Sequence, residues 1–192
     1  MTTPKALIFD LDGTLADSMD VHWQAWREQA QLYGLTLSEE RFYQMGGIPT
    51  ERIAAILARE QAVAVDALAF RRDKEASFHR NLHRIRPIEE VVAVARESRG
   101  KIPMAVATGS LRSGAAKVLG VLGIADWFDA VVCDEDVSHP KPDPEIFLTA
   151  ARRLGVAPEF CTVYEDAPAG IKGARDAGMQ VVDVNEFLKL HR

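Results

Sequence analysis

The sequence predicts an α/β fold, a three-layer Rossmann-like core with a parallel sheet and an inserted all-helical cap. Two observations predict it. Along most of the chain, short apolar runs typical of buried strands alternate with segments of helical periodicity, as in parallel strands joined by helices. Between residues 18 and 84 this alternation stops, because only helical segments occur there. We therefore expect an α/β core formed by residues 1–16 and 85–192, and a helical cap formed by residues 17–84.

The first strand is expected over residues 6–9, and it ends at two carboxylates, Asp10 and Asp12, followed by Gly13. In a parallel sheet, ligands bind at the carboxyl ends of the strands. Burying two carboxylates there without partners would be costly. A magnesium ion and a phosphate group would give both carboxylates a partner, whereas the plainer alternative is a strand that ends in a polar turn.

The inserted segment is predicted to contain four helices, and its ends, residues 15–18 and 84–87, are expected to act as hinges. Ser38 and Asp66 are typical N-cap residues, and Gly34 is typical of a helix end. The helices are expected over residues 21–33, 38–43, 50–60 and 66–83.

The alternation of strands and helices returns after the insertion. The sequence Asp143-Pro144-Glu145 is a strong helix start, with a cap, a proline at the first position and an acid in the first turn. Strands are expected over residues 104–107, 130–133, 162–164 and 181–184, and helices over 87–98, 110–122, 143–155 and 168–177. Together with the first strand, these segments predict a sheet of five strands.

Two groups of residues after these strands are suited to bind phosphate. Thr108-Gly109-Ser110 would place a hydroxyl group and backbone N–H groups at the start of a helix. Lys141 lies between two prolines in a stiffened loop, where its ammonium group can meet phosphate oxygens as a point charge. The plainer alternatives are a helix cap for Ser110 and a solvated surface position for Lys141.

Two adjacent acids, Glu165 and Asp166, follow the fourth predicted strand. Such a pair suits Mg²⁺, a hard cation that prefers a few carboxylates together with retained waters. The alternative is a pair of acids stabilised by the dipole of the following helix.

The composition is that of an ordinary globular protein. The 192 residues are 47% hydrophobic, carry a formal charge of −5 and contain no basic run, so we expect no nucleic-acid partner. Cys133 and Cys161 lie in apolar runs and are expected to be buried free thiols in a reducing compartment. Neither a signal sequence nor a membrane-spanning run is found. We expect a cytoplasmic protein, a monomer, whose partner is a small phosphorylated metabolite.

The sequence DLDGT that starts at Asp10 resembles the first motif of the haloacid dehalogenase superfamily of phosphotransferases. Thr108, Lys141 and Glu165-Asp166 match the other three motifs in order, each after a predicted strand, so the chain is identified as a member over nearly its whole length. The cap position resembles that of the helical-cap subfamily, which includes β-phosphoglucomutase and sugar-phosphate phosphatases. Parts of the sequence also resemble bacterial fructose-1-phosphate phosphatases.

The resemblance implies roles for these residues. Asp10 would be the nucleophile that forms an aspartyl phosphate, and Asp12 the general acid and then the general base. Mg²⁺ would be held by the Asp10 side chain, the backbone carbonyl of Asp12 and Asp166, with Glu165 nearby. The transferring phosphoryl group would be bound by Thr108, Gly109, Ser110 and Lys141.

In the cap, His22 and Trp26 follow Asp12 at spacings similar to those of β-phosphoglucomutase, which implies that His22 approaches the substrate. An ordinary packing role for His22 is the open alternative. Lys74 resembles a lysine of that family that contacts the sugar.

We expect a phosphatase acting on a small sugar phosphate similar to fructose 1-phosphate. A mutase needs a second phosphate site, which the family builds with a cap arginine, and Thr50 stands where that arginine would fall. Arg52, two residues later, is a second candidate for reaching inward, so a phosphoglucomutase-type activity is the alternative. A dehalogenase is disfavoured because halide release needs neither a general acid nor Mg²⁺. A non-catalytic binding protein is the remaining alternative.

Overall fold

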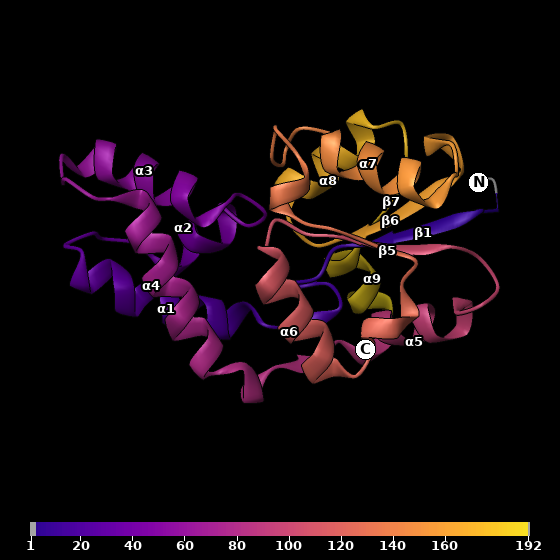
Figure 1. The fold of residues 1–192 in the computed structure, drawn as a ribbon, viewed down its shortest axis with the longest axis horizontal. Coiled ribbons are helices and arrows are strands. Elements are labelled where there is room, and N and C mark those ends of the chain that lie inside the picture. Colours follow the sequence, from indigo (N-terminus) through magenta and orange to yellow (C-terminus); the bar gives the residue numbers. More distant parts are fainter. Residues whose placement is uncertain (1–2, 192) are drawn as a thin grey trace.

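The computed structural model describes residues 3–191, and residues 1, 2 and 192 of the predicted core lie outside them. Figure 1 shows two lobes side by side: a sheet lobe, which contains both ends of the described chain, and a helical lobe formed by residues 19–80.

The sheet lobe is built on five parallel strands in the order β5-β4-β1-β6-β7. The strands are β1 (Ala6–Phe9), β4 (Met104–Ala107), β5 (Ala130–Val132), β6 (Cys161–Glu165) and β7 (Gln180–Asp183). The central strand is β1, whose Ile8 pairs with Ala105 on one side and Val163 on the other. Because all strands are parallel, their carboxyl ends meet at one edge of the sheet.

Helices cover both faces of the sheet, as the sequence predicts for three layers (Figure 1). One face is covered by α5 (Glu89–Ser98), α6 (Arg112–Leu122) and α9 (Val184–His191), the other by α7 (Glu145–Leu154) and α8 (Pro168–Asp176). Leu7 and Phe9 pack against the first group, and Ala6 and Ile8 against the second. Burying each large apolar side chain contributes about 1.5–3 kcal/mol, so β1 is stabilised from both faces.

The helical lobe consists of α1 (Met19–Leu32), α2 (Glu39–Gln44), α3 (Thr50–Gln61) and α4 (Ala67–Arg80). Their apolar faces enclose a core of their own, which includes Trp26, Leu57 and Phe70. The predicted caps are present, because Ser38 accepts from the Arg41 N–H and Asp66 accepts from the first turn of α4. The four helices match the four that the sequence predicts.

The chain passes between the lobes twice, at the two predicted hinges. There β2 (Ala16–Asp17) and β3 (Arg86–Pro87) pair antiparallel, with Ala16 opposite Pro87 and Asp17 opposite Arg86. This β2–β3 ribbon joins the lobes. The division into domains at residues 16/17 and 84/85 stays a prediction.

Several predicted boundaries differ from the structure. Pro87 belongs to β3, so that α5 begins at Glu89, and α6 begins at Arg112 because Ser110 is used elsewhere. The helix α9 was not predicted at all, since a short segment after the last strand offers little periodicity. Four 3₁₀ turns complete the structure: η1 (Leu82–Arg84), η2 (Ala125–Trp127), η3 (Asp134–Asp136) and η4 (Pro158–Phe160).

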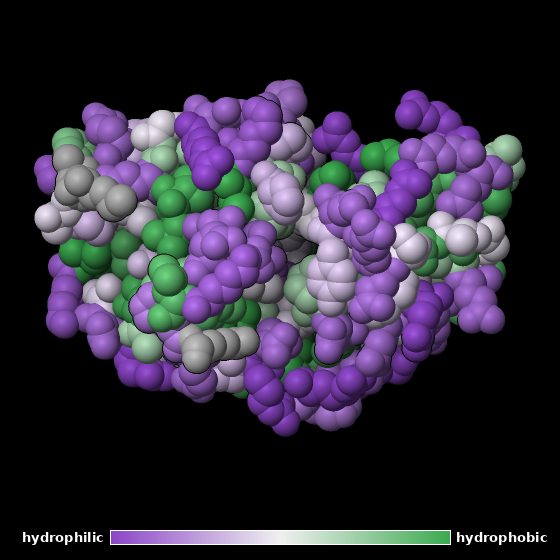
Figure 2. Space-filling model, turned by 180° about the vertical axis from the view of Figure 1, so that it is seen from behind, coloured by the Kyte–Doolittle hydropathy of each residue, from purple (hydrophilic) through white to green (hydrophobic). Residues whose placement is uncertain are grey.

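The surface is mixed in character. On the face seen in Figure 2, hydrophilic residues spread over both lobes with smaller apolar patches between them. Cys133 and Cys161 are buried free thiols. Among residues 3–191, every helix is too short or too polar to cross a bilayer.

Candidate active site

The residues that the sequence predicts for the site meet at the carboxyl edge of the sheet. Asp10 follows β1 directly and Thr108 follows β4. Glu165 is the last residue of β6, and Asp166 is the next residue in the sequence. Lys141 reaches the same point from the loop between η3 and α7. Residues far apart in the sequence are brought together because parallel strands end on the same side.

Lys141 is buried between two carboxylates. Its Nζ donates to Asp10 Oδ1 at 2.7 Å, to Glu165 Oε2 at 2.7 Å and to the carbonyl oxygen of Ala107 at 3.1 Å. Burial alone would lower the pKa of Lys141, but the charges of Asp10 and Glu165 outweigh it and raise that pKa above its usual value. The ammonium group is therefore a fixed positive charge next to Asp10.

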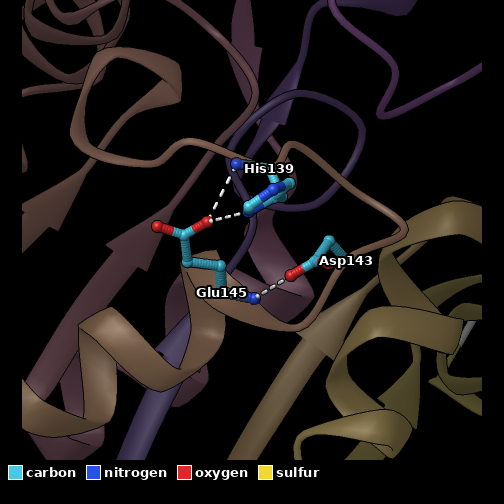
Figure 3. A group of neighbouring side chains, drawn as sticks. All are labelled: His139, Asp143 and Glu145. Carbon is cyan, nitrogen blue, oxygen red and sulfur yellow. Dashed lines mark hydrogen bonds and ion pairs between the residues drawn. The ribbon is translucent and has the colours of Figure 1, made fainter.

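The loop that carries Lys141 is fastened by the group of side chains in Figure 3. The Glu145 carboxylate accepts from the backbone N–H groups of Ser138 and His139 and pairs with His139 Nδ1 at 3.0 Å. Asp143 Oδ1 in turn accepts from the Glu145 N–H at 2.9 Å. The two backbone N–H groups lower the pKa of Glu145. These hydrogen bonds close the loop on both sides of Lys141 and so aim its side chain at the sheet.

Three carboxylates converge beside Lys141. One oxygen each of Asp10, Glu165 and Asp166 lies within 4.8 Å of the others. Burial and the charge of Glu165 raise the pKa of Asp10 well above its ordinary value and that of Asp166 to about 7. Three acids face one lysine, so the cluster lacks positive charge. An all-oxygen donor set with this deficit fits a hard divalent cation such as Mg²⁺.

The cluster is held by close backbone packing. Thr14 donates to Asp166 Oδ1 at 2.9 Å, and Glu165 Oε1 accepts from the Ala167 N–H at 3.0 Å. Gly13 has a φ of +89°, and a Cβ atom on it would lie 2.3 Å from Asp166 Oδ2. Only glycine lets the motif turn pass this close to the carboxylate.

Asp12 stands in different surroundings from Asp10. Its Oδ1 accepts from Ser18 at 2.7 Å and lies 3.1 Å from His22 Nε2, and its Oδ2 accepts from Ser110 at 2.7 Å. Burial alone would raise the pKa of Asp12, but His22 and these hydrogen bonds hold it well below the ordinary value. Asp12 is therefore a carboxylate in this arrangement, oriented by groups from both lobes.

His22 is the link between Asp12 and the helical lobe. Lys74 Nζ lies 2.8 Å from His22 Nδ1 and 2.9 Å from Glu75 Oε1, and the imidazole stacks on Phe78 at 3.9 Å between ring centroids. Burial and Lys74 lower the pKa of His22. Because a lysine ammonium can only donate, Nδ1 of His22 accepts this hydrogen bond. We infer that Nε2 carries the ring proton and donates a hydrogen bond to Asp12.

The predicted phosphate loop is closely covered by the helical lobe. Thr108 Oγ1 accepts from the Ser110 N–H at 3.0 Å, which shapes the turn. A Cβ atom on Gly109 would lie 3.2 Å from the carbonyl oxygen of Gly47, from the loop before α3. The two lobes therefore touch directly over the site.

A cavity of about 100 Å³ lies between the lobes. Asp10, Asp12, Thr108, Gly109, Ser110 and Asp166 line it from the sheet lobe. The predicted cap residues His22, Trp26, Thr50 and Lys74 line it from the helical lobe. Arg52 is exposed on α3 and is not among the lining residues, so its side chain does not reach into the cavity.

Sequence reasoning missed other charged residues at the cavity. These are Glu51, Arg71, Glu75 and Asp134. The apolar positions of α3 are the one signal that bears on Glu51, but they fix its orientation only if the phase of the helix is known to within one residue. No pattern in the sequence singled out Arg71, because arginine residues are mostly found on the protein surface.

Comparison with known proteins shows what the chain is similar to. The family model described as haloacid dehalogenase-like hydrolase matches residues 7–184. The fructose-1-phosphate phosphatase YqaB of Escherichia coli is 42% identical over 179 residues, which cover 93% of this chain and 95% of that protein. The β-phosphoglucomutase of Bacillus subtilis is 31% identical over 191 residues, which cover 95% of this chain and 84% of that protein. A solved β-phosphoglucomutase structure from Clostridium difficile superposes with a TM-score of 0.86 at 26% identity, covering 94% of this chain and 84% of that one.

Proposed function

This chain is an enzyme of the haloacid dehalogenase-like hydrolase family, and we propose that it is a magnesium-dependent phosphatase that hydrolyses a small sugar phosphate similar to fructose 1-phosphate. One observation gives this proposal its strongest support. Two carboxylates two residues apart stand in opposite surroundings, Asp10 against Lys141 and Asp12 against His22. Hydrolysis through a covalent intermediate needs one carboxylate to attack and another to move protons.

Asp10 is the proposed nucleophile. An oxygen of its carboxylate attacks phosphorus, the bond from phosphorus to the sugar oxygen breaks, and an aspartyl phosphate forms. A carboxylate and a phosphate dianion repel each other, so the attack needs positive charge nearby. Lys141, 2.7 Å from Asp10, supplies one such charge.

Asp12 is the proposed proton carrier. In its acid form it gives a proton to the leaving sugar oxygen. The carboxylate so formed later takes a proton from the water that hydrolyses the aspartyl phosphate, which restores the acid form for the next turnover. The contacts of Asp12 with Ser18, His22 and Ser110 favour its carboxylate form, which is the form that takes the proton from this water.

The metal and phosphate ligands follow from the same cluster. We propose that Mg²⁺ is held by Asp10, the backbone carbonyl of Asp12 and Asp166, with Glu165 nearby; when bound, it neutralises charge on the phosphoryl group. Thr108, Gly109 and Ser110 contribute the hydroxyl and N–H groups that bind the phosphate oxygens.

The substrate class is proposed from the helical lobe and the relatives. His22, Trp26, Thr50 and Lys74 line the cavity, so a short, hydroxyl-rich substrate would contact them. The similarity to a protein named fructose-1-phosphate phosphatase supports the same class. Phosphosugar mutase activity is the second candidate, supported by the relatives named β-phosphoglucomutase. A cytoplasmic location and a monomeric state stay predictions.

The test is a phosphate-release screen over sugar monophosphates with Mg²⁺ or with excess chelator. We expect turnover with Mg²⁺ only, no turnover by Asp10→Asn, and a loss of about 10²–10⁴-fold in Asp12→Asn. Asp176→Asn, an exposed carboxylate on α8, is the control and should act like the wild type. Full activity in chelator, or substantial activity in Asp10→Asn, would contradict the mechanism.

The mutase alternative needs its own arm. β-Glucose 1-phosphate is incubated with a trace of the 1,6-bisphosphate, and both products are followed. Free phosphate should accumulate. Glucose 6-phosphate appearing faster than phosphate would replace the hydrolase proposal by the mutase.

A further inference from the structure

Three charged side chains that the proposed mechanism does not use meet at the cavity. Glu51 lies in the first turn of α3 and Arg71 on α4, and Arg71 Nη1 lies 2.9 Å from Glu51 Oε1. Their side chains are 26% and 28% exposed, so the pair is largely shielded from solvent. Asp134, the first residue of η3, lines the same cavity from the sheet lobe.

Asp134 lines the same cavity as this pair, but from the sheet lobe. In agreement with that position, burial and the charge of Glu51 raise the pKa of Asp134, and Arg71 lowers it. Its backbone N–H donates to the carbonyl oxygen of Ser110 at 3.3 Å, which ties it to the phosphate loop. Two carboxyl groups and one guanidinium group therefore line this part of the cavity from both lobes. Their net charge is −1 when both carboxyl groups are ionised.

This cluster lies away from the reacting end of the cavity. Asp134 follows β5, which is two strands from β1, and two strand spacings place it on the order of 10 Å from Asp10. On α4, Arg71 precedes Lys74 by about one turn, roughly 5 Å along the axis, and Lys74 is the residue that contacts His22. The cluster thus faces the end of the substrate that does not react.

We propose that Glu51, Arg71 and Asp134 select substrates by their far end, admitting a neutral, hydroxyl-rich end and excluding a second phosphate group. The proposal rests on the proposed phosphatase function and names its substrate class more narrowly. The charge of Arg71 is already paired with Glu51 through Nη1, which weakens its attraction for a second phosphate. Sugar hydroxyls can donate to the two carboxylates, whereas a phosphate dianion is repelled by them, which is selection by an unfavourable contact.

The test compares the binding of two probes, fructose 1-phosphate and fructose 1,6-bisphosphate, by calorimetry in the Asp10→Asn background, which does not consume them. With the cluster unmodified, the Asp10→Asn protein should bind fructose 1-phosphate at least tenfold more tightly than fructose 1,6-bisphosphate. Glu51→Gln combined with Asp134→Asn should reduce this preference at least tenfold, because it removes the repulsion and frees Arg71. Arg71→Met should widen the preference, because two acids are left without a counter-charge.

The control is Glu60→Gln, which removes an exposed carboxylate from the last turns of α3, where it pairs with Arg41. It should leave the preference unchanged within twofold. An unchanged preference in the double variant, tighter binding of the bisphosphate by the unmodified cluster, or no binding of either probe would overturn the proposal. The ratio of kcat/KM for the two probes in the active enzyme repeats the comparison. If the active enzyme hydrolyses neither probe nor any sugar monophosphate of the screen while the binding preference follows the cluster, the phosphatase proposal fails and the selectivity of the cluster stands.

Discussion

Gly13 follows the two carboxylates of the first motif and packs closely against the metal-ligand candidate Asp166. Replacing it with alanine would place a Cβ atom 2.3 Å from Asp166 Oδ2, so the carboxylate has to move. We expect Gly13→Ala to weaken Mg²⁺ binding about 10–100-fold, as displacement of groups around a metal ligand does. Calorimetric titration with Mg²⁺ measures this directly, and phosphate release should fall in parallel.

Gly100→Ala is the matched control for this change. Gly100 also has a positive φ, of +72°, but nothing lies within 4 Å of a Cβ atom there. Each variant should lose about 1 kcal/mol of stability because alanine is strained at positive φ, and only Gly13→Ala also displaces Asp166. Equal Mg²⁺ affinity in the two variants would show that Asp166 is not a metal ligand.

At the scale of single residues, the sequence predicted what strand ends determine. Asp10, Thr108, Glu165 and Asp166 follow strands, so their meeting point could be derived from the alternation alone. Lys141 could not be placed against Asp10 from its loop without the resemblance to the superfamily.

The cavity side of the helical lobe was harder to predict. The buried positions of α3 include Ile53 and Leu57, and Arg52 falls outside that face while Glu51 lies at the cavity. Which charged residue points inward is decided by helix phase, and a one-residue error reverses the answer.

Among the elements, β5, α6 and α7 are tied together by a single side chain. Asp136 in η3 accepts from the Cys133 N–H at 2.8 Å and from Arg153 of α7 at 2.8 Å, and it also pairs with Arg112 of α6. Since α6 and α7 cover opposite faces of the sheet, the Asp136 carboxylate joins all three layers at the edge of the sheet.

Asp136→Asn should therefore destabilise the fold in a pH-dependent way. Although partial burial raises it, the pKa of Asp136 is lowered from 3.8 to about 2 by Arg153, the Cys133 N–H and Arg112. A depressed pKa stabilises the fold above about pH 4, and this contribution disappears as pH falls through 2. We expect a loss of about 1–2 kcal/mol at pH 7 and almost none at pH 2, measured by urea unfolding.

The comparison variant here is Asp176→Asn, whose carboxylate pairs with Lys172 four residues earlier on the surface of α8. An exposed pair of this kind contributes less than about 0.5 kcal/mol. A pH-independent loss in Asp136→Asn, or an equal loss in both variants, would contradict the proposed role.

The alternation of strands and helices predicted the order of the core elements well. Their ends were less accurate, because end positions depend on tertiary contacts. Ser110 could have capped a helix, but its hydroxyl bonds to Asp12 instead and α6 starts two residues later.

At the scale of the whole molecule, two glycines mark places where the lobes come close to each other. Gly47 touches Gly109, and Gly114 of α6 faces Glu75 and His79 of α4, with 3.6 Å from a Cβ atom to Glu75 Oε2. We propose that the helical lobe is a cap that closes over the core. Gly114→Leu should then hold the lobes apart and raise KM for fructose 1-phosphate at least tenfold, while circular dichroism stays unchanged.

Gly120→Leu is the control on the same helix, where nothing lies within 4 Å of a Cβ atom. It should leave KM unchanged and stabilise α6 slightly, since glycine is unfavourable within a helix. Equal KM values in the two variants would show that the contact at Gly114 is not needed for substrate binding.

The β2–β3 ribbon has a further consequence for how the lobes meet. Because the helical lobe is joined to the core at both of its ends, and the two connections pair side by side, its local concentration at the site is high, on the order of millimolar for short tethers. Weak contacts are then enough to change the population of the closed form, about tenfold for 1.4 kcal/mol. A few hydrogen bonds from a sugar can supply that free energy, so the affinity for substrate and the closing of the molecule are two measures of the same event.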